Sequence, residues 1–464
     1  MAPHADGLAG KGQAAAAKVT DQYHATSSAS AIEAEAKYAA HNYHPLPVVF
    51  ARASGSDVWD PEGKHYLDFL SAYSAVNQGH CHPELVKALC DQAQRLTLTS
   101  RAFYNDVFPK WAEKMKDVFG YDMVLPVNTG AEAVETALKI ARKWGYKSKG
   151  IPQDKALIFA AADNFHGRTL GAITLSTDPD SRTNYGPYVP NIGAVNPTTG
   201  KQIRYNNVSD IEELLAAHGK ETAAILLEPI QGEAGVVVPD DDYLTRVHAL
   251  CKQHNVLLII DEIQTGIGRT GRMLCSEWSN ITPDLVTLGK ALSGGMYPVA
   301  CVLGRAEIML TVEPGTHGST YGGNPLGCAV SMRALEVMEE EGLTARAEKL
   351  GEVLRKGLRE IDSPMVKLVR GKGLLNAIII DEAHTGGHTA WDLCMLMKSK
   401  GLLAKPTHEN IIRFAPPLVI SEEDIHKALG IIKESIQELP TLKGEKEDEI
   451  IPAADKNVKI HLDD

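Results

Sequence analysis

Five aliphatic residues in a row, at positions 256–260, run directly into the acidic pair Asp261 and Glu262. A continuous aliphatic run bounded in this way is typical of a strand that is buried on both faces, as in a parallel sheet between helices. Lys290 follows later in the sequence Thr-Leu-Gly-Lys-Ala-Leu-Ser-Gly-Gly. The chain therefore presents an acid at the end of a buried strand and a lysine in a glycine-lined loop.

An acid and a lysine of this kind are what an enzyme needs to hold pyridoxal 5'-phosphate. The lysine amine condenses with the cofactor aldehyde, and a desolvated site raises the neutral, nucleophilic fraction of that amine. The acid keeps the ring nitrogen protonated, so that the ring can accept the electron pair that a substrate carbon releases with its proton. We therefore expect Lys290 and Asp261 to be the catalytic residues.

Helical patterns alternate with short apolar runs between about residues 86 and 331, which indicates βαβ units. Further on, residues 332–358 have helical spacing, and residues 366–380 and 411–414 have strand character. An early hairpin at residues 58–69 could join these later strands. The sequence predicts an α/β fold: a large domain with a mostly parallel, doubly wound sheet, and a smaller α+β domain built from the N- and C-terminal segments.

The expected organisation has five segments. They are a flexible extension (1–30), an N-terminal segment joining the small domain (31–84), the large cofactor-binding domain (85–331), the C-terminal small domain (332–442) and a flexible acidic tail (443–464).

Composition excludes several classes of partner. The net charge of -12 and the pI near 5.8 argue against nucleic acid, because phosphate binding relies on a basic face. No apolar run approaches the ~20 residues of a membrane helix. Seven scattered cysteines suit reduced thiols, and the first arginine is Arg52, unlike an Arg-rich transit peptide. We expect a cytoplasmic protein with no disulfide and no membrane span.

Two glycine-containing stretches are candidate anion sites. Residues 128–132 (Asn-Thr-Gly-Ala-Glu) lie between an apolar strand and an amphipathic helix, whose N-terminus offers free N–H groups. Small residues at 318–327 allow backbone and hydroxyl donors to approach an anion. Each stretch is equally consistent with an ordinary connection or loop. Arg168 and Arg413 need partners, and these are either a substrate carboxylate or a structural acid.

His80 and His82, in Gly-His-Cys-His-Pro, suggest a metal site at first sight. Without further ligands, this spacing more often forms a turn that leads into a helix beginning near Pro83. We expect no metal there.

Three motifs together closely resemble the class III aminotransferases of fold type I: residues 261–266, the Lys290 loop and residues 318–327. Within that family, further stretches resemble the ornithine aminotransferases, and the likeness covers nearly everything from residue 31 to 436. These stretches are residues 42–47, 74–80, 228–233, 401–407 and 413–418.

The resemblance implies a set of cofactor contacts around Lys290 and Asp261. Phe165 and Ile263 would sandwich the ring, and Gln264 would reach its phenolic oxygen. The phosphate-binding residues would be Gly130 and Ala131, with Ser319 and Thr320 from the partner subunit of a homodimer, or of a larger oligomer.

The resemblance also implies how two different substrates are held. For ornithine, Arg168 would bind the α-carboxylate, Tyr43 the α-amine, and Tyr73 would lie beside the chain, which places the δ-amine at the cofactor. Glutamate and 2-oxoglutarate would use Arg413, which Glu233 masks while ornithine is bound. The product, glutamate 5-semialdehyde, would cyclise to pyrroline-5-carboxylate.

Alternatives remain open. Another enzyme of the family could act on acetylornithine or 4-aminobutyrate, although a substrate without a free α-amine has no use for Tyr43. A non-catalytic relative would have little reason to keep both Lys290 and Asp261. The stretch 190–206 and both termini are longer than the family pattern, and His166 is given no role.

Overall fold

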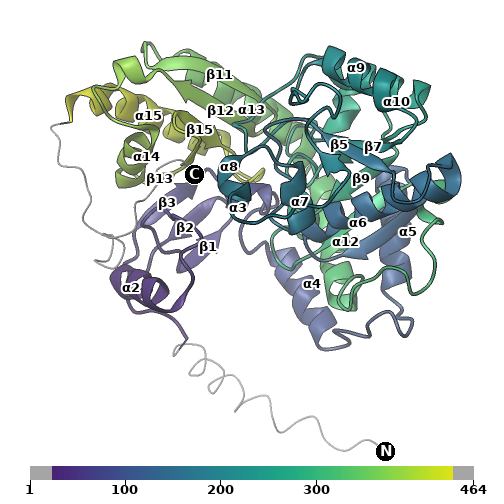
Figure 1. Ribbon diagram of the computed structural model, residues 1–464. Coiled ribbons are helices and arrows are strands. Elements are labelled where there is room, and N and C mark those ends of the chain that lie inside the picture. The colour runs from purple at the N-terminus through teal and green to yellow at the C-terminus, as the bar shows by residue number, and fades with distance from the viewer. Residues whose placement is uncertain (1–22, 443–464) are drawn as a thin grey trace, which may run out of the picture.

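The computed structural model describes residues 23–442 (Figure 1). Most of the expected N-terminal extension and all of the expected acidic tail lie outside the described residues. Helix α2 (Ser28–Tyr38) begins inside the segment that the sequence assigns to the extension. It begins there because Ser27 and Ser30 form a reciprocal capping box around the first turn.

The largest sheet has seven strands in the order β4-β10-β9-β8-β7-β5-β6. Strand β10 is antiparallel to both of its neighbours, and the other strands run parallel, so the predicted mostly parallel sheet is confirmed. The strands are β4 (Met123–Val127), β5 (Leu157–Ala160), β6 (Ile192–Gly193), β7 (Thr222–Leu227), β8 (Leu257–Asp261), β9 (Leu285–Leu288) and β10 (Ala300–Gly304).

The aliphatic run at residues 256–260 contributes side chains to two hydrophobic cores, one on each face of the sheet. Leu257 and Ile259 pack with helix α6 on one face of the sheet. Leu258 and Ile260 pack with helices α9 and α10 on the other face. Because successive side chains of a strand point to opposite faces, a doubly covered strand needs an apolar residue at every position.

Helices cover both faces of this sheet (Figure 1). In chain order they are α4 (Pro83–Ala93), α5 (Phe108–Phe119), α6 (Gly130–Trp144), α7 (Leu170–Leu175), α8 (Pro179–Arg182), α9 (Val208–His218), α10 (Tyr243–Gln253), α11 (Ala306–Met309) and α12 (Pro325–Glu340).

The direction of β10 follows from its connection. Strands β9 and β10 are joined by the short 3₁₀ turn η3 (Lys290–Ser293) and a glycine loop, without a crossover helix. A parallel neighbour needs a crossover of about a dozen residues or more, whereas an antiparallel one does not. The chain therefore reverses its direction at the lysine loop, directly beside the sheet.

Two four-stranded sheets make up the rest of the protein, on the left in Figure 1. The predicted hairpin at residues 58–69 is confirmed as β2 and β3, and β13 from the C-terminal part pairs parallel with β3. The first sheet contains β1 (Arg52–Ser54), β2 (Asp57–Trp59), β3 (His65–Asp68) and β13 (Leu402–Leu403). The second contains β11 (Val366–Lys372), β12 (Leu375–Ile380), β14 (Lys405–Thr407) and β15 (Ile411–Phe414).

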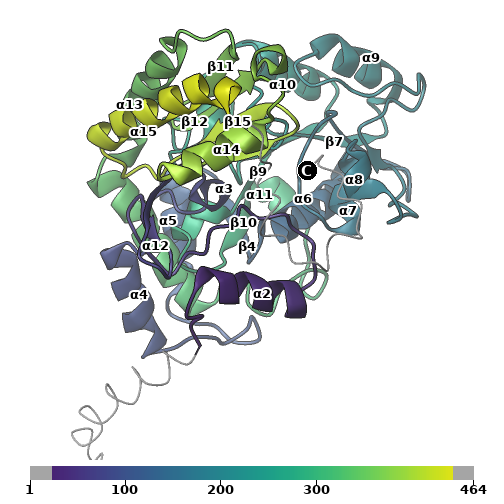
Figure 2. The same ribbon diagram turned by 90° about the vertical axis from the view of Figure 1, so that its left-hand side faces the viewer.

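Helices α13 (Leu343–Arg359), α14 (Ala390–Ser399) and α15 (Glu422–Glu438) pack beside these sheets, as Figure 2 shows. The strands predicted at residues 366–380 and 411–414 are thus present. Helix α12 runs through position 331, where the sequence analysis divides the large domain from the small one.

Residues 190–206, the stretch that is longer than the family pattern, carry the edge strand β6 and a bridge between Val195 and Gln202. This stretch therefore lies at the edge of the large sheet. Among residues 23–442, no helix is long and apolar enough to cross a membrane.

Candidate active site

Three parallel strands deliver acids and the lysine to one edge of the large sheet. Asp261 ends β8, Glu228 directly follows β7, and Lys290 comes two residues after β9. The register pairs Asp261 with Thr287 across β8 and β9. Ligands of open α/β sheets lie beyond the carboxyl ends of the strands, and that is where these side chains are.

The lysine loop also packs against the start of α6. A Cβ atom on Gly130 would lie 3.0 Å from Cδ1 of Ile263, and one on Gly289 would lie 3.5 Å from Cγ2 of Ile263 and 3.7 Å from Cα of Gly130. The two glycines therefore allow three segments to meet closely: the Lys290 loop, the α6 N-terminus and the segment after β8. The tight approach favours glycine at position 130, whereas a Cβ atom at position 289 would make only ordinary van der Waals contacts.

Three hydrogen-bonding groups surround the carboxylate of Asp261. Its Oδ2 atom lies 2.7 Å from Nδ1 of His166, and its Oδ1 accepts bonds of 3.1 Å from the Ile263 N–H and from the Thr287 hydroxyl. Only 5% of Asp261 is exposed. Burial alone would lower the pKa of His166, but its bond to Asp261 outweighs this and raises the pKa. The pair places a cationic donor behind the carboxylate.

His166 is a functional residue that the sequence analysis missed. Its Nε2 atom is buried without a hydrogen-bond partner among the described residues. The only signal in the sequence is its position next to Phe165, because its partner Asp261 lies 95 residues away.

Glu228 links two loops of the site. Its carboxylate accepts the Phe165 N–H at 3.1 Å and the Gly232 N–H at 3.2 Å. Burial raises the pKa of Glu228 to about 7, with His166 acting in the opposite direction. The sequence predicts no role for Glu228, and the structure shows that it links the Phe165 loop to the loop of Glu233.

Lys290 has a left-handed backbone, with φ of 46°, at the start of η3. Its amine makes no hydrogen bond or ion pair with another described residue. Burial lowers the pKa of Lys290, and Glu233 partly offsets this. A desolvated amine without a partner is the form that attacks an aldehyde.

Arg413, on β15, is paired with Glu233. Its Nη1 lies 2.7 Å from Oε1 of Glu233, and that same oxygen accepts a 3.1 Å bond from Nε2 of Gln264. Burial would raise the pKa of Glu233, but Arg413 dominates and lowers it to about 2. Of the two partners considered for Arg413, a substrate carboxylate or a structural acid, the structure contains the acid. The Oε1 atom of Gln264 is buried without a partner among the described residues.

The other expected substrate residues gather near this pair. The Cζ atom of Arg413 lies 5.0 Å from the ring centre of Tyr73. Burial raises the pKa of Tyr73, which also responds to the charges of Arg413, Glu233, Tyr43 and Arg168. Tyr43 is 67% exposed. Arg168 is exposed and makes no ion pair with the described residues, and its Cζ lies 6.0 Å from the Phe165 ring centre.

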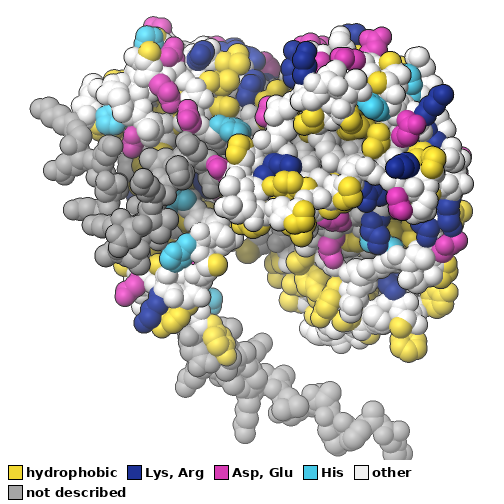
Figure 3. All heavy atoms as spheres, viewed as in Figure 1, with side chains coloured by type: hydrophobic (Ala, Val, Ile, Leu, Met, Phe, Trp, Pro, Cys, Tyr) yellow, Lys and Arg dark blue, Asp and Glu magenta, His cyan; other side chains and the backbone are white. Residues whose placement is uncertain are grey.

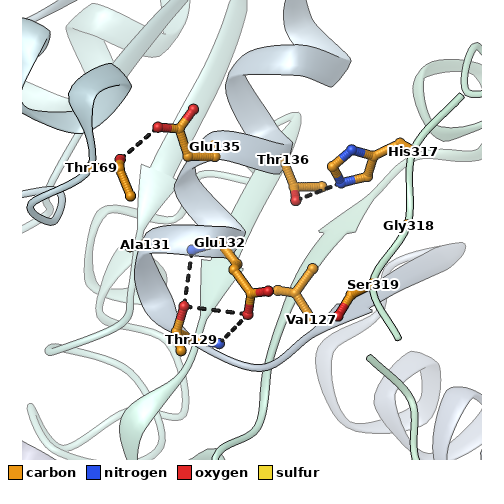
Figure 4. A pocket seen from close by; sticks show the side chains of 10 residues that line it. All are labelled: Val127, Thr129, Ala131, Glu132, Glu135, Thr136, Thr169, His317, Gly318 and Ser319. Atoms are coloured by element: carbon orange, nitrogen blue, oxygen red, sulfur yellow. Dashed lines mark hydrogen bonds between the residues drawn. The ribbon is translucent and has the colours of Figure 1, made fainter. Parts of the chain in front are cut away.

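The N-terminus of α6 lies beside a pocket that Figure 4 shows from close by. Thr129 and Glu132 form a capping box, while the N–H groups of Gly130 and Ala131 bind no described residue. Such unpaired first-turn donors favour an anion. Nδ2 of Asn128 donates to the Ser319 hydroxyl at 2.8 Å. The pocket lining is Val127, Thr129, Ala131, Glu132, Glu135, Thr136, Thr169, His317, Gly318 and Ser319.

Ser319 thus lies next to the α6 N-terminus of its own chain, and Thr320 beside it is exposed. The expectation that both residues reach the phosphate of a partner subunit stays a prediction.

These residues fit pyridoxal phosphate. The cofactor needs an amine for its aldehyde, an anionic carboxylate for its ring nitrogen and donors for its phosphate. Lys290, Asp261 and the unpaired N–H groups of Gly130 and Ala131 supply the three in one place.

The two histidines of the Gly-His-Cys-His-Pro turn have different partners. Nε2 of His80 lies 2.7 Å from Oδ2 of Asp68, and Nε2 of His82 lies 2.9 Å from Oε1 of Glu341. Pro83 begins α4, as the turn interpretation predicts. Within residues 23–442, no group of three or more His, Cys, Asp or Glu side chains could hold a metal ion.

Known proteins resemble this chain over nearly its full length. The ornithine aminotransferase of Emericella nidulans is 69% identical over 441 residues, which are 95% of this chain and 97% of that protein. The solved ornithine aminotransferase of Toxoplasma gondii, with PLP at partial occupancy in its active site, has a TM-score of 0.86 and 45% identity, covering 91% of this chain and 97% of that one. The solved acetylornithine aminotransferase of Elizabethkingia anophelis has a TM-score of 0.81 and 52% identity, covering 89% of this chain and 100% of that one.

The family model described as aminotransferase class-III matches residues 38–436. The match contains the end of β8, the lysine loop and the Arg413–Glu233 pair, so the geometry and the comparisons agree. The chain belongs to the class-III aminotransferase family.

Proposed function

We propose that this protein transfers the δ-amino group of L-ornithine to 2-oxoglutarate, giving glutamate 5-semialdehyde and glutamate, with pyridoxal 5'-phosphate as cofactor. The observation that carries the proposal is the Arg413–Glu233 pair beside Lys290, while Arg168 has no acid partner among residues 23–442. One arginine that is paired with an acid and one that is not would suit two carboxylate-bearing substrates of different length.

When bound, pyridoxal phosphate supplies an aldehyde and a ring that accepts electrons. Asp261 would hold the ring nitrogen, with His166 hydrogen-bonded to its carboxylate. Phe165 and Ile263 would cover the ring, and Gln264 would bind its phenolic oxygen. Gly130 and Ala131 would bind the phosphate with their N–H groups, together with Ser319 and Thr320 of the partner subunit.

Lys290 is both the attachment point and the proton carrier. When its amine is not attached to the cofactor, that amine would take a proton from the substrate carbon that bears the reacting nitrogen. The lowered pKa supports this role, because a neutral amine is needed at physiological pH.

Ornithine is oriented by its far end. Arg168 binds the α-carboxylate and Tyr43 the α-amine, with Tyr73 beside the carbon chain, so that the δ-amine reaches the cofactor. Arg413 stays neutralised by Glu233 during this half-reaction. A group already paired at 2.7 Å attracts a second carboxylate weakly, which supports the order of events.

Glutamate and 2-oxoglutarate bring a carboxylate next to the reacting carbon. That carboxylate displaces Glu233 from Arg413, which then binds it through two parallel N–H···O bonds.

We propose a homodimer, or a larger oligomer built from it, with each active site shared between two subunits. Exposed aromatic side chains support this assembly, among them Phe103 (74% exposed), Tyr104 (93%) and Tyr321 (52%). Hydrophobic side chains gather at the lower right of the face in Figure 3. Soluble monomers rarely expose large apolar patches.

The proposed compartment is the cytoplasm. All seven cysteines are free, which suits a reducing environment. The mitochondrial matrix also keeps thiols reduced, so cell fractionation with an antibody to the protein is the deciding test.

The function is tested by measuring pyrroline-5-carboxylate, and glutamate released from 2-oxoglutarate, with ornithine, acetylornithine and 4-aminobutyrate as donors. Ornithine is expected to have the highest kcat/KM by at least about tenfold, equivalent to about 1.4 kcal/mol of transition-state discrimination. A preference for acetylornithine would contradict the proposal and favour the alternative that the Elizabethkingia anophelis enzyme represents.

A further inference from the structure

Tyr73 lies in a left-handed helical turn. The four residues of α3 (Ser71–Ser74) all have positive φ angles, of 53°, 47°, 59° and 69°, and none is glycine. Each such residue places its Cβ close to the next carbonyl oxygen, so that four in succession are strained. A conformation of this kind persists only where the surroundings enforce it.

Asp68 supplies one set of constraints. Its Oδ1 accepts the N–H of Leu70 at 2.8 Å and the N–H of Ser71 at 2.9 Å. Its Oδ2 lies 2.7 Å from Nε2 of His80, which fixes the carboxylate itself. Asp68 is only 2% exposed, so that water does not compete for these bonds.

Ser71 supplies the link to the arginine. Its hydroxyl donates to the carbonyl of Ala415 at 2.6 Å, and the N–H of Ala415 donates to the carbonyl of Phe69 at 2.7 Å. Ala415 is two residues beyond Arg413. The segment that carries Arg413 and the turn that carries Tyr73 are therefore joined by two bonds.

These contacts place the ring of Tyr73 over the guanidinium of Arg413, where Cζ lies 5.0 Å from the ring centre. A ring on one face of a guanidinium attracts it and excludes water from that face. The in-plane N–H groups remain available for a carboxylate, which at rest is that of Glu233.

We propose that Ser71 and Asp68 are positioning residues for the dicarboxylate substrate: they hold the strained turn that keeps Tyr73 over Arg413. The inference rests on the proposed function, because Arg413 receives a substrate only with glutamate and 2-oxoglutarate. Ornithine depends on the turn much less, because Arg168 and Tyr43 bind its charged groups and Tyr73 only lies beside its carbon chain. A merely structural turn would affect both substrates alike.

The test compares Ser71→Ala with Ser74→Ala. Both residues are buried in the same turn, but the Ser74 hydroxyl bonds to no described residue. In Ser71→Ala, the dissociation constant of glutarate, an unreactive dicarboxylate measured by calorimetry on the holoenzyme, is expected to rise about three- to tenfold, the effect of one lost hydrogen bond. The apparent KM for ornithine is expected to change by less than about twofold, within the spread of a neutral change.

A second variant, Ser71→Ala/Ala72→Gly, guards against misfolding. Ala72 is exposed, and glycine adopts the left-handed conformation without a Cβ penalty, so this chain reaches the turn more easily. Its glutarate affinity is expected to lie between those of Ser71→Ala and Ser74→Ala.

The inference is overturned if glutarate binds the Ser71→Ala enzyme as tightly as the Ser74→Ala enzyme, or if ornithine and glutarate weaken equally. Should the single variant not fold, the double variant decides: affinity equal to that of Ser74→Ala overturns the inference. Failure of the unsubstituted enzyme to convert ornithine would instead contradict the proposed function. This outcome is detected by assaying the unsubstituted enzyme, without comparing any variant.

Discussion

Nδ1 of His166 lies 2.7 Å from Oδ2 of Asp261, and both side chains are almost fully buried. The contact makes a charge-assisted pair behind the place where the sequence predicts the cofactor ring. The imidazole fixes the orientation of the Asp261 carboxylate, so that the acid can face a ring nitrogen.

Replacing His166 should therefore weaken catalysis without removing Asp261. We expect His166→Phe to lower kcat/KM about ten- to a hundredfold, since a hydrogen bond to a charged group contributes about 1.5–3 kcal/mol. His166→Asn, whose amide can still donate, should retain more activity. Steady-state kinetics and titration of pyridoxal phosphate into the apoprotein measure both effects. Unchanged cofactor affinity and rate in His166→Phe would contradict this role.

Glu233→Gln tests the ion pair through acid stability. The pKa of Glu233 is lowered to about 2 in the folded chain, from an ordinary value of 4.5. A lowered pKa stabilises the fold above the unfolded value, and this stabilisation is lost as pH falls through 4.5 towards 2. The stability difference between the native chain and Glu233→Gln should thus be constant above about pH 5 and shrink below about pH 4.5.

Urea denaturation at several pH values, followed by circular dichroism, gives this difference. A difference that does not depend on pH between about 5 and 3 would mean that Glu233 is not held ionised by Arg413. The same variant should accept α-amino substrates more readily, because Arg413 is unmasked.

Gly232→Ala should also disturb the Arg413–Glu233 pair, in this case through the side chain of Gln264. A Cβ atom at this position would overlap Oε1 of Gln264, so Gln264 must leave its bond to Glu233. We expect the preference for ornithine over glutamate to fall about three- to tenfold, as for one lost hydrogen bond. Gly430→Ala is the matched control, because a Cβ there meets no atom within 4 Å. Equal kinetics in the two variants would argue against the packing described.

Lys149 gives a prediction about stability alone. Its amine donates to the carbonyls of Gly219, Thr222 and His254 at 2.7, 2.8 and 3.1 Å. Lys149→Met should cost about 2–3 kcal/mol, because these bonds involve a charged donor, with kcat/KM unchanged. The control is Lys147→Met, whose exposed pair with Glu313 contributes less than about 1 kcal/mol. Chemical denaturation of both variants decides, and equal losses would contradict the prediction.

Much of this molecule could be predicted from the sequence. The aliphatic residues 256–260 predicted a strand covered on both faces, and the structure places an apolar core on each face. Asp261 was predicted at the end of that strand and Lys290 in a glycine-lined loop, and both lie at the same edge of the parallel strands. The unpaired N–H groups of Gly130 and Ala131 also stand where the helix N-terminus was expected.

Other features depend on contacts between distant residues and left no local pattern. His166 gains its role only from Asp261, and the left-handed turn at Ser71 contains no glycine to signal it. The antiparallel direction of β10 follows from a short connection whose path the sequence does not reveal. A long-range hydrogen bond, backbone strain and a short connection decide these three features in turn.

The central claim is that Lys290 carries the cofactor opposite Asp261. The most direct test reduces the purified holoenzyme with borohydride, digests it and locates the pyridoxyl group by mass spectrometry. The account predicts that the group is found on the peptide containing Lys290, and that Lys290→Ala folds normally but shows neither the adduct nor turnover. An adduct on a different lysine, or full activity in Lys290→Ala, would contradict it.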